Sequence, residues 1–526
     1  MSKPSIKKNF IYNIFYQVLA IIVPLITSPY LARVLGAEKI GINTWTYSVV
    51  FYFMIFATLG VNNYGNRSIA YIRDDKNELS RKFWSIYSCQ AFASTMVIFI
   101  YIIYLVCFAN KYKLIASLQI FYILGNAFDI TWFFYGLEEF KITVARNSFV
   151  KIMGLVAIFI FVQTPNDLWK YTLIVSGTSF LGQIFLWPLV LKRIRFVRVR
   201  LCDMIPHIKP ICVLFIPVLA ISIFANMDKY MIGLMSNMSQ TGFYENANKI
   251  IEIPKAVITA LGTVMLPRTA NLIATGNEEK SKVYIRNTMI YTILLGSAFV
   301  FGMAAVAETF SVIFWGEDFV TSGRLIAVMA PAILFSVFGN VIRTQYLIPR
   351  SKDKEYTISL LVGAIINFSI NYMLIPKMGA MGASVASVIS EFCMTFLQSF
   401  YVRKSLDIKN YLLDNYMFIV IGFIMFGVVK VIGNYLSVSI GTLLVMIISG
   451  ALVYVCLIAI LLKMSRKENI QLIRKLVCEQ RYRHLEPSAE QSAVQCWPVL
   501  AVPEAMRSAR ACSTALSTAR RSSRAP

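Results

Sequence analysis

Residues 226–255 read NMDKYMIGLMSNMSQTGFYENANKIIEIPK, and they place charges inside two segments that are otherwise apolar enough to cross a membrane. At about 100° per residue, the polar side chains of the second segment gather on one helix face. These are Glu245, Asn248, Lys249, Glu252 and Lys255. A charge at the centre of a bilayer costs about 2.5–3.5 kcal/mol on insertion scales. The face is therefore predicted to border a wetted, protein-lined space; the alternatives are an interfacial amphipathic helix or internal ion pairs.

The composition is that of a polytopic membrane protein. Of 526 residues, 57% are hydrophobic and 15% are charged, and the mean hydropathy is +0.63. The net charge of +24 would favour nucleic-acid binding in a soluble protein, but here the basic residues lie in short loops between apolar runs. No nucleic-acid partner is therefore expected. Nine cysteines without paired spacing and only two histidines argue against a disulfide framework or a histidine metal site.

Fourteen apolar stretches are predicted to span the membrane, which makes the fold class all-α and polytopic. They lie at about 10–35, 40–62, 84–108, 112–136, 147–163, 168–191, 211–235, 243–273, 287–313, 325–348, 355–375, 380–401, 416–436 and 439–463. We expect an N-terminal lobe of six spans at 1–200, a second six-span lobe at 201–405 and two additional spans at 406–465. Residues 466–526 are predicted to form a cytoplasmic tail.

The tail differs from the rest of the chain. From about Cys478 the sequence becomes rich in Ala, Ser, Arg, Pro and Glu, which favours disorder. A basic tail that binds the membrane surface is the alternative. No function is assigned to it.

The loops alternate in charge. With the N-terminus inside, the cytoplasmic loops carry most of the basic residues, as the positive-inside rule requires, and both termini are cytoplasmic. The opposite loops hold few cations, namely Lys39, Lys111, Lys113, Arg324 and Lys377. This asymmetry accounts for most of the net charge.

Two stretches repeat a short pattern at the entrance of a span. Leu35-Gly36-x4-Gly41-Ile42 enters the second span, and Ser239-x2-Gly242-Phe243 enters the eighth. Each follows a span that contains proline and ends in charge. If the two halves are structural repeats, a binding site is expected at their interface, lined by interrupted helices.

Motifs for catalysis are missing. The sequence contains no G-x4-G-K-[ST] phosphate loop, no HExxH and no G-x-S-x-G elbow. Its outer loops are too short for the acceptor-binding domain that a membrane polymerase or ligase needs. These absences favour a transporter over an enzyme.

Three stretches resemble the bacterial polysaccharide flippases, the Wzx-type O-antigen exporters of the multidrug/oligosaccharidyl-lipid/polysaccharide exporter superfamily. They are PYLARVLGAEKIGINTWTYSVVFYFMIFATLGVNNYGNR at 29–67, DKYMIGLMSNMSQTGFYENANKIIEIP at 228–254 and GAMGASVASVISE at 379–391. The resemblance implies two lobes that rock between inward-open and outward-open states in the bacterial inner membrane. It also implies a cargo, an undecaprenyl-pyrophosphate-linked oligosaccharide such as an O-antigen or capsule repeat unit, carried to the outer leaflet without a cofactor. A polysaccharide polymerase and a chain-length regulator are the protein partners it suggests.

A pyrophosphate-linked sugar needs cations and polar side chains in a wet cavity. The candidate contacts are Arg33, Lys229, Lys249, Lys255, Asn226 and Asn248. Arg33 is the first choice for the pyrophosphate because arginine binds phosphate through two donors, and a snorkelling arginine at a helix end is the alternative. The asparagines could instead bond neighbouring helices.

Three acidic residues within spans are candidates for coupling transport to a proton or sodium gradient: Asp228, Glu391 and Asp129. A structural, hydrogen-bonded carboxyl group is the alternative for each. Residues 132–135, Trp-Phe-Phe-Tyr, could stack on sugars, but we expect them to anchor the membrane interface. A cation-coupled multidrug or small-molecule antiporter is the second functional hypothesis, and a membrane polymerase or ligase is the third.

Overall fold

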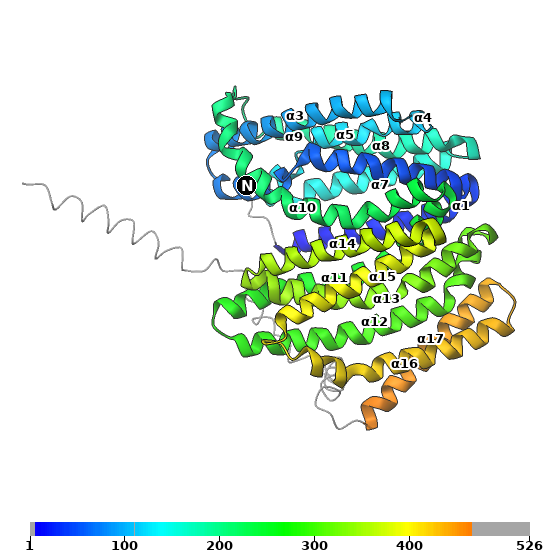
Figure 1. Cartoon of the computed structure of the whole chain (residues 1–526). Helices are drawn as coiled ribbons and strands as arrows, with labels where there is room; N and C mark the ends of the chain where they lie inside the picture. Colours follow the sequence, from blue (N-terminus) through cyan, green and yellow to red (C-terminus); the bar gives the residue numbers. More distant parts are fainter. Residues whose placement is uncertain (1–5, 110, 465–526) are drawn as a thin grey trace, which may run out of the picture. The chain divides into compact units, whose positions relative to one another are not determined.

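The chain is helical throughout the part described by the computed structural model, residues 6–109 and 111–464. Side chains are described from Phe15 onward, except those of residues 261, 263 and 264. Residues up to Ile458 form one compact unit, and a second unit begins at Ala459. Only the end of the last helix belongs to the second unit within the described residues (Figure 1). The predicted disordered tail at 466–526 lies outside the described residues.

The elements follow in chain order. The α-helices are α1 (Ile6–Thr58), α2 (Val61–Ile72), α3 (Lys76–Cys107), α4 (Lys113–Leu118), α5 (Ile120–Ala127), α6 (Thr131–Gly136), α7 (Phe140–Phe161), α8 (Leu168–Ile184), α9 (Trp187–Leu191), α10 (Leu201–Met235), α11 (Met238–Ala274), α12 (Glu278–Trp315), α13 (Val320–Ile342), α14 (Asp353–Met378), α15 (Ala380–Val402), α16 (Ile408–Tyr435) and α17 (Ile440–Met464). Short 3₁₀ turns occur at Pro165–Asp167, Glu317–Phe319 and Ile348–Arg350, and a π-helical turn occurs at Arg343–Leu347. No strand is found in these residues.

The membrane spans agree with the sequence prediction. Within the described ranges, 13 helical segments are long and apolar enough to cross a bilayer. The first runs over 58 residues, more than twice the ~20 that a span needs. It breaks at Gly36, where φ is 75°, a left-handed conformation that glycine adopts without steric cost. Counting the two sides of this break separately gives the fourteen predicted spans, and the predicted all-α polytopic fold is confirmed.

Helices from the first part of the chain pack largely on one another, as do those from the second part. In Figure 1 most of the blue and cyan helices lie together with the green α10 beside them, and the other green and yellow helices lie together. Helix α1 contacts α3, α5 and α7, whereas α12 contacts α13 and α16, and α14 contacts α15. Helix α1 also packs along α10 and α11, so it connects the two sets. The lobe boundary near residue 200 stays a prediction.

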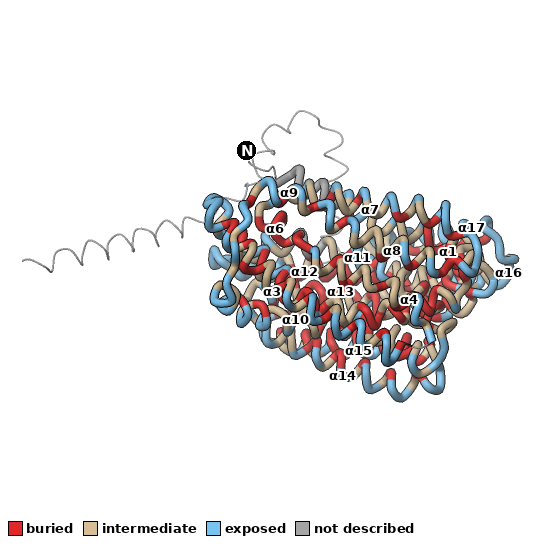
Figure 2. The backbone as a smooth tube through the Cα atoms, turned by 90° about the horizontal axis from the view of Figure 1, so that it is seen from above, coloured by how far each residue is buried: buried red, intermediate tan, exposed pale blue. Residues whose placement is uncertain are grey.

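Burial differs greatly between helices. Helix α13 is the most enclosed of the described spans, whereas α10 and α17 are among the least (Figure 2). Exposed apolar side chains such as Phe99, Phe423 and Leu452 are expected to face lipid in a membrane protein.

The aromatic run at 132–135 lies largely in the core, so the prediction that it anchors the membrane interface is wrong. Trp132, Phe133 and Phe134 have no exposed surface. Their short helix, α6, packs closely against α2 because Gly65 lies directly beneath the Trp132 ring. The indole Nε1 of Trp132 donates to Gln90 Oε1 at 3.1 Å, so burial leaves its polar atom satisfied.

The two glycines of the repeated pattern meet where α1 crosses α11. A Cβ atom on Gly41 would lie 1.7 Å from the carbonyl oxygen of Met238, and one on Gly242 would lie 2.0 Å from that of Ala37. Real Cβ atoms do not approach backbone oxygens so closely, so the crossing tolerates only glycine at both positions. The contact is reciprocal: each glycine faces the carbonyl four residues before the other.

Replacing either glycine by alanine should force α1 and α11 apart. Overpacking of this kind costs roughly 1–3 kcal/mol, so Gly41→Ala and Gly242→Ala should each lower the melting temperature of the detergent-solubilised protein. Gly177→Ala is the matched control, because a Cβ at this helical position in α8 meets no atom within 4 Å. Equal melting temperatures for all three variants would contradict the close crossing.

Candidate functional site

One carboxylate holds two of the predicted lysines. Glu245 Oε2 lies 2.7 Å from Lys229 Nζ, and Glu245 Oε1 lies 3.2 Å from Lys249 Nζ. The pairs join α10 to α11 and link successive turns of α11. The Lys249 side chain is 35% exposed, against 16% for Lys229 and 13% for Glu245. The cluster therefore has one excess positive charge, and its most accessible member is Lys249.

Residues from the first part of the chain reach the same region. Tyr171 of α8 packs against the same buried hydrophobic cluster as Tyr244 and Ala247 of α11. Next to Lys229, the carbonyl oxygen of Tyr230 accepts a hydrogen bond from Trp45 Nε1 at 3.2 Å. The lysine cluster thus lies on two helices, α10 and α11, that both pack along α1.

The third predicted lysine belongs to a second cluster. Lys255 Nζ lies 3.1 Å from Glu252 Oε1 and 3.4 Å from Glu391 Oε1, which joins α11 to α15. Lys255 and Glu391 are nearly enclosed, with 14% and 8% of their side chains exposed. With two carboxylates and one ammonium, this cluster has one excess negative charge. The polar face of α11 therefore forms ion pairs, which were one of the alternatives that the sequence left open.

Asp228 occupies a buried, uncharged environment. Its Oδ2 accepts hydrogen bonds from Tyr244 Oη at 2.6 Å and Ser387 Oγ at 2.8 Å, and its Oδ1 accepts one from Asn371 Nδ2 at 2.6 Å. No residue in the described ranges forms an ion pair with it. Four helices, α10, α11, α14 and α15, contribute these groups.

Further oxygen atoms surround this carboxylate. Asn371 also donates to Asn367 Oδ1 at 3.0 Å, and its own Oδ1 is buried without a hydrogen-bond partner. Carboxylate, amide and hydroxyl oxygens are ligands of hard cations. Asp228 is the only charged member of the set, so the chemistry suits a monovalent cation or a proton better than a divalent ion.

Arg33, a residue of α1, contacts the C-terminal end of α12. Its exposed guanidinium donates from Nη2 to the carbonyl oxygens of Ile313 and Phe314, at 3.0 and 3.4 Å. Carbonyls in the last turn of a helix have no partner within the helix, and a cation stabilises them. Among the described residues, no contact of Arg33 with Lys229 or Lys249 is found, so its role in binding pyrophosphate stays a prediction.

The other predicted residues differ in their surroundings. Asp129 Oδ1 accepts from the backbone N and Oγ1 of Thr131, at 2.9 and 2.6 Å, at the start of α6. This local bonding favours a structural role over ion coupling. Asn226 is buried and Asn248 half-buried. Neither side chain has a hydrogen bond to another residue of the described chain, so both can accept new partners.

Sequence reasoning missed the residue that organises the lysines. Glu245 was placed on the polar face of its helix, but not among the binding residues. The spacing Glu245–Lys249 is the i,i+4 pair that stabilises helices, and this was the available signal. Nothing local connects Lys229 to Glu245, because the partners lie on two helices.

Comparison with known proteins now identifies the family. Residues 6–273, more than half of the chain, match the family described as "Polysaccharide biosynthesis protein". The chain belongs to this family. The predicted membership of the polysaccharide flippase group is thereby confirmed.

The relatives agree with this family. The chain is 23% identical over 412 residues to a protein of Escherichia coli (strain K12) named "Putative O-antigen transporter", which covers 77% of this chain and 98% of that protein. Among solved structures, it is similar to the lipid II flippase MurJ in an inward closed conformation, with a TM-score of 0.70 at 15% identity over 86% of this chain and 98% of that one. It is also similar to an inward-facing multidrug transporter of the MATE family, with a TM-score of 0.55 at 12% identity over 74% of this chain and 94% of that one. At these identities the two structures establish the fold.

The lysine cluster makes an asymmetric prediction about stability. Glu245→Gln leaves two ammonium groups unneutralised in a poorly hydrated site, and breaking a buried pair costs about 3–5 kcal/mol. Because Lys249 is partly exposed, we expect the low end of that range. Lys249→Gln leaves the Lys229–Glu245 pair neutral, so it should fold almost as the wild type does. Thermal unfolding in detergent measures both, and equal losses would contradict the shared carboxylate.

Proposed function

We propose that this protein carries an undecaprenyl-pyrophosphate-linked oligosaccharide from the cytoplasmic to the outer leaflet of the bacterial inner membrane. The observation that carries the proposal is the pair of lysines that Glu245 holds between α10 and α11, two helices that pack along α1. Its excess positive charge suits an anionic headgroup. The family and the named relatives support a cargo of this class.

The geometry divides the work between the two lysines. Lys229 is enclosed and 2.7 Å from Glu245, so it neutralises this carboxylate. Lys249 is more exposed and more weakly held, at 3.2 Å, so it can turn to a phosphate oxygen without leaving Glu245 unpaired. Asn248 is adjacent, and Asn226 lies one turn before Lys229 on α10. Both asparagines offer donors and acceptors for sugar hydroxyls.

The orientation follows from the loop charges. The positive-inside rule supports cytoplasmic termini, with the loop between α10 and α11 on the outer side. Under the proposal, residues 1–200 and 201–405 rock as two lobes about the α1–α11 crossing, and residues 406–465 add two spans to the second. A polymerase and a chain-length regulator that use the delivered repeat units are the proposed partners.

Asp228 is the preferred site for the coupling ion, a proton or sodium. Its carboxylate is buried among oxygen atoms with no cation from the described residues, whereas Glu391 already has Lys255 beside it. An ion gradient would then supply the energy, and no cofactor is needed.

A multidrug antiporter of the same fold remains the second candidate. The similarity to a MATE transporter and the uncharged surroundings of Asp228 favour it. The net positive lysine cluster opposes it, because a site for cationic drugs would place acidic groups there.

The transport proposal predicts that Lys249→Gln strongly slows translocation without loss of folded protein. Reconstituted proteoliposomes with a fluorescent lipid-linked oligosaccharide measure translocation directly, and we expect at least a roughly tenfold slower rate because one charge-assisted phosphate contact is lost. Lys430→Gln is the matched control, since this lysine of α16 lies outside both clusters. If the wild type exports a cationic dye but leaves the glycolipid in place, the antiporter is correct.

The coupling proposal predicts that Asp228→Asn removes the dependence on the gradient. The amide is of nearly the same size and keeps acceptor capacity for Tyr244 and Ser387, but it has no charge for an ion to neutralise. Translocation would be measured with a sodium or proton gradient imposed and then collapsed. Glu391→Gln serves as comparison: if only that variant loses the gradient response, the coupling site lies beside Lys255 instead.

A further inference from the structure

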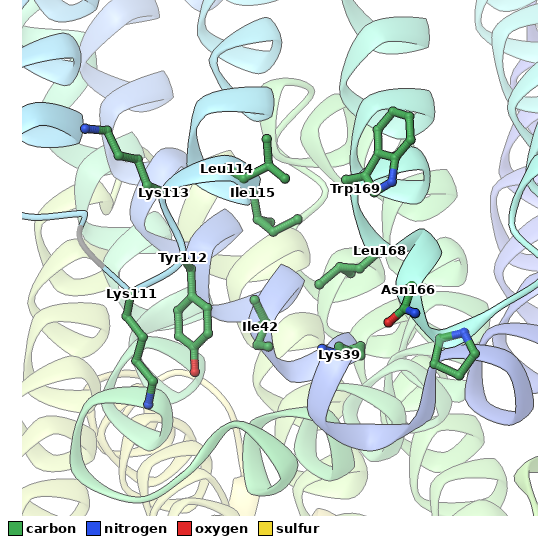
Figure 3. A pocket seen from close by; sticks show the side chains of 11 residues that line it. Lys39, Ile42, Lys111, Tyr112, Lys113, Leu114, Ile115, Asn166, Leu168 and Trp169 are labelled. Carbon is green, nitrogen blue, oxygen red and sulfur yellow. The ribbon is translucent and has the colours of Figure 1, made fainter.

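A pocket of about 380 Å³ is lined by residues of α1, α4 and α8 and of the chain just before α4 and α8, and no member of either charge cluster lines it (Figure 3). Its wall is built at three connections of the chain: α1 just after its break at Gly36, the start of α4 with Lys111 and Tyr112 before it, and the turn that leads into α8. The residues that matter here are Lys39, Lys111, Tyr112, Lys113, Asn166 and Trp169. With the proposed orientation, all three connections are on the outer side of the membrane.

The pocket collects lysines that have no acidic partner. In the part of the chain that is described, no ion pair is found for Lys39, Lys111 or Lys113. The neighbouring carboxylate of Asp167 is occupied, because it lies 2.6 Å from Lys170 Nζ and accepts the backbone N–H groups at Gln163 and Thr164. Glu38, beside Lys39, is exposed and does not line the pocket. The pocket therefore has a positive electrostatic potential, which salt screens beyond a Debye length of roughly 10 Å.

This concentration is unusual for an outer surface. The positive-inside rule removes lysine and arginine from outer loops, and the sequence has only five cations there. Three of the five line one pocket, although they come from two loops about 70 residues apart. Topology gives no reason for this gathering, so a binding role is the simplest account.

The remaining side chains suit a sugar. Trp169 is 42% exposed and is one of the residues that line the pocket, and an aromatic face can pack on the apolar face of a pyranose ring. The Asn166 amide supplies a donor and an acceptor for hydroxyl groups. In Figure 3, Lys39 points toward Ile42 and Tyr112, whereas Lys111 and Lys113 extend outward from their loop. Lys111 and Lys113 point away from one another in this view, and we call them the rim lysines.

We propose that this pocket binds a negatively charged sugar, one with a carboxylate or phosphate substituent, in the glycan that leaves the transport path. The inference rests on the proposed function, and it assigns the cargo to the acidic glycans. The anion pairs with Lys39 and the rim lysines, and the ring packs on Trp169. Binding at the outer end would favour release of the glycan on that side.

The test is equilibrium binding to the full-length protein in nanodiscs of neutral lipid. The probes are trigalacturonate, its uncharged methyl ester and inorganic pyrophosphate. We expect trigalacturonate to bind, the methyl ester to bind at least about tenfold more weakly because the charge-assisted bonds are lost, and pyrophosphate to compete poorly because it cannot stack. The combined variant Lys39→Gln, Lys111→Gln, Lys113→Gln should lose this binding, and Trp169→Ala should weaken it severalfold.

Lys377→Gln is the matched control, because it removes an outer-loop charge that does not line the pocket. Equal binding of charged and neutral sugars, unchanged binding in the triple variant, or pyrophosphate binding as tight as that of trigalacturonate would each overturn the proposal. The outcome is separable from the proposed function. Failure of the wild type to translocate glycolipid refutes the flippase, whereas translocation without trigalacturonate binding refutes only the pocket.

Discussion

The cost of charge in a low-dielectric site is the constraint on which the centre of this protein depends. Two ammonium groups near one another inside a membrane protein repel, and Glu245 makes them tolerable by bonding to both. The same carboxylate fixes α10 against α11. The arrangement leaves one positive charge uncompensated, so binding of an anion would neutralise the cluster. A carrier can use this excess charge to hold an anionic cargo, because the cluster is neutral only while the anion is bound.

Neighbouring residues connect this cluster to the other features of the site. On α11, Gly242 contacts α1, Tyr244 bonds to Asp228, and Glu245 bonds to the lysines. On α10, Asp228 and Lys229 are adjacent, yet one belongs to the oxygen-lined site and the other to the lysine cluster. A shift of α10 along α11 therefore changes both sites and the α1 crossing together. This is the physical requirement for coupling an ion to a cargo, a two-state element that both ligands can bias.

Local pattern predicted the parts of this structure that local forces determine. Apolar length gave all fourteen spans, and the 3.6-residue period gave the polar face of α11. Partners distant in sequence were out of reach: Asp228 depends on Asn371 and Ser387, more than 140 residues later. The burial of Trp132 was missed for the same reason, since it follows from Gly65 on another helix and not from the aromatic run itself.

The sign of charge changes along α11, and this bears on the choice between cargoes. The cluster at Glu245 is net positive and lies within about three turns of the helix start at Met238, whereas the cluster at Lys255 and Glu391 is net negative and lies deeper. A phosphorylated headgroup is attracted to the first and repelled by the second, so it has one preferred depth. A cationic drug would experience the reverse order. An anionic headgroup held near one end leaves its lipid tail in hydrocarbon and its glycan pointing toward the loops, which is the geometry that moving a glycolipid across a bilayer requires.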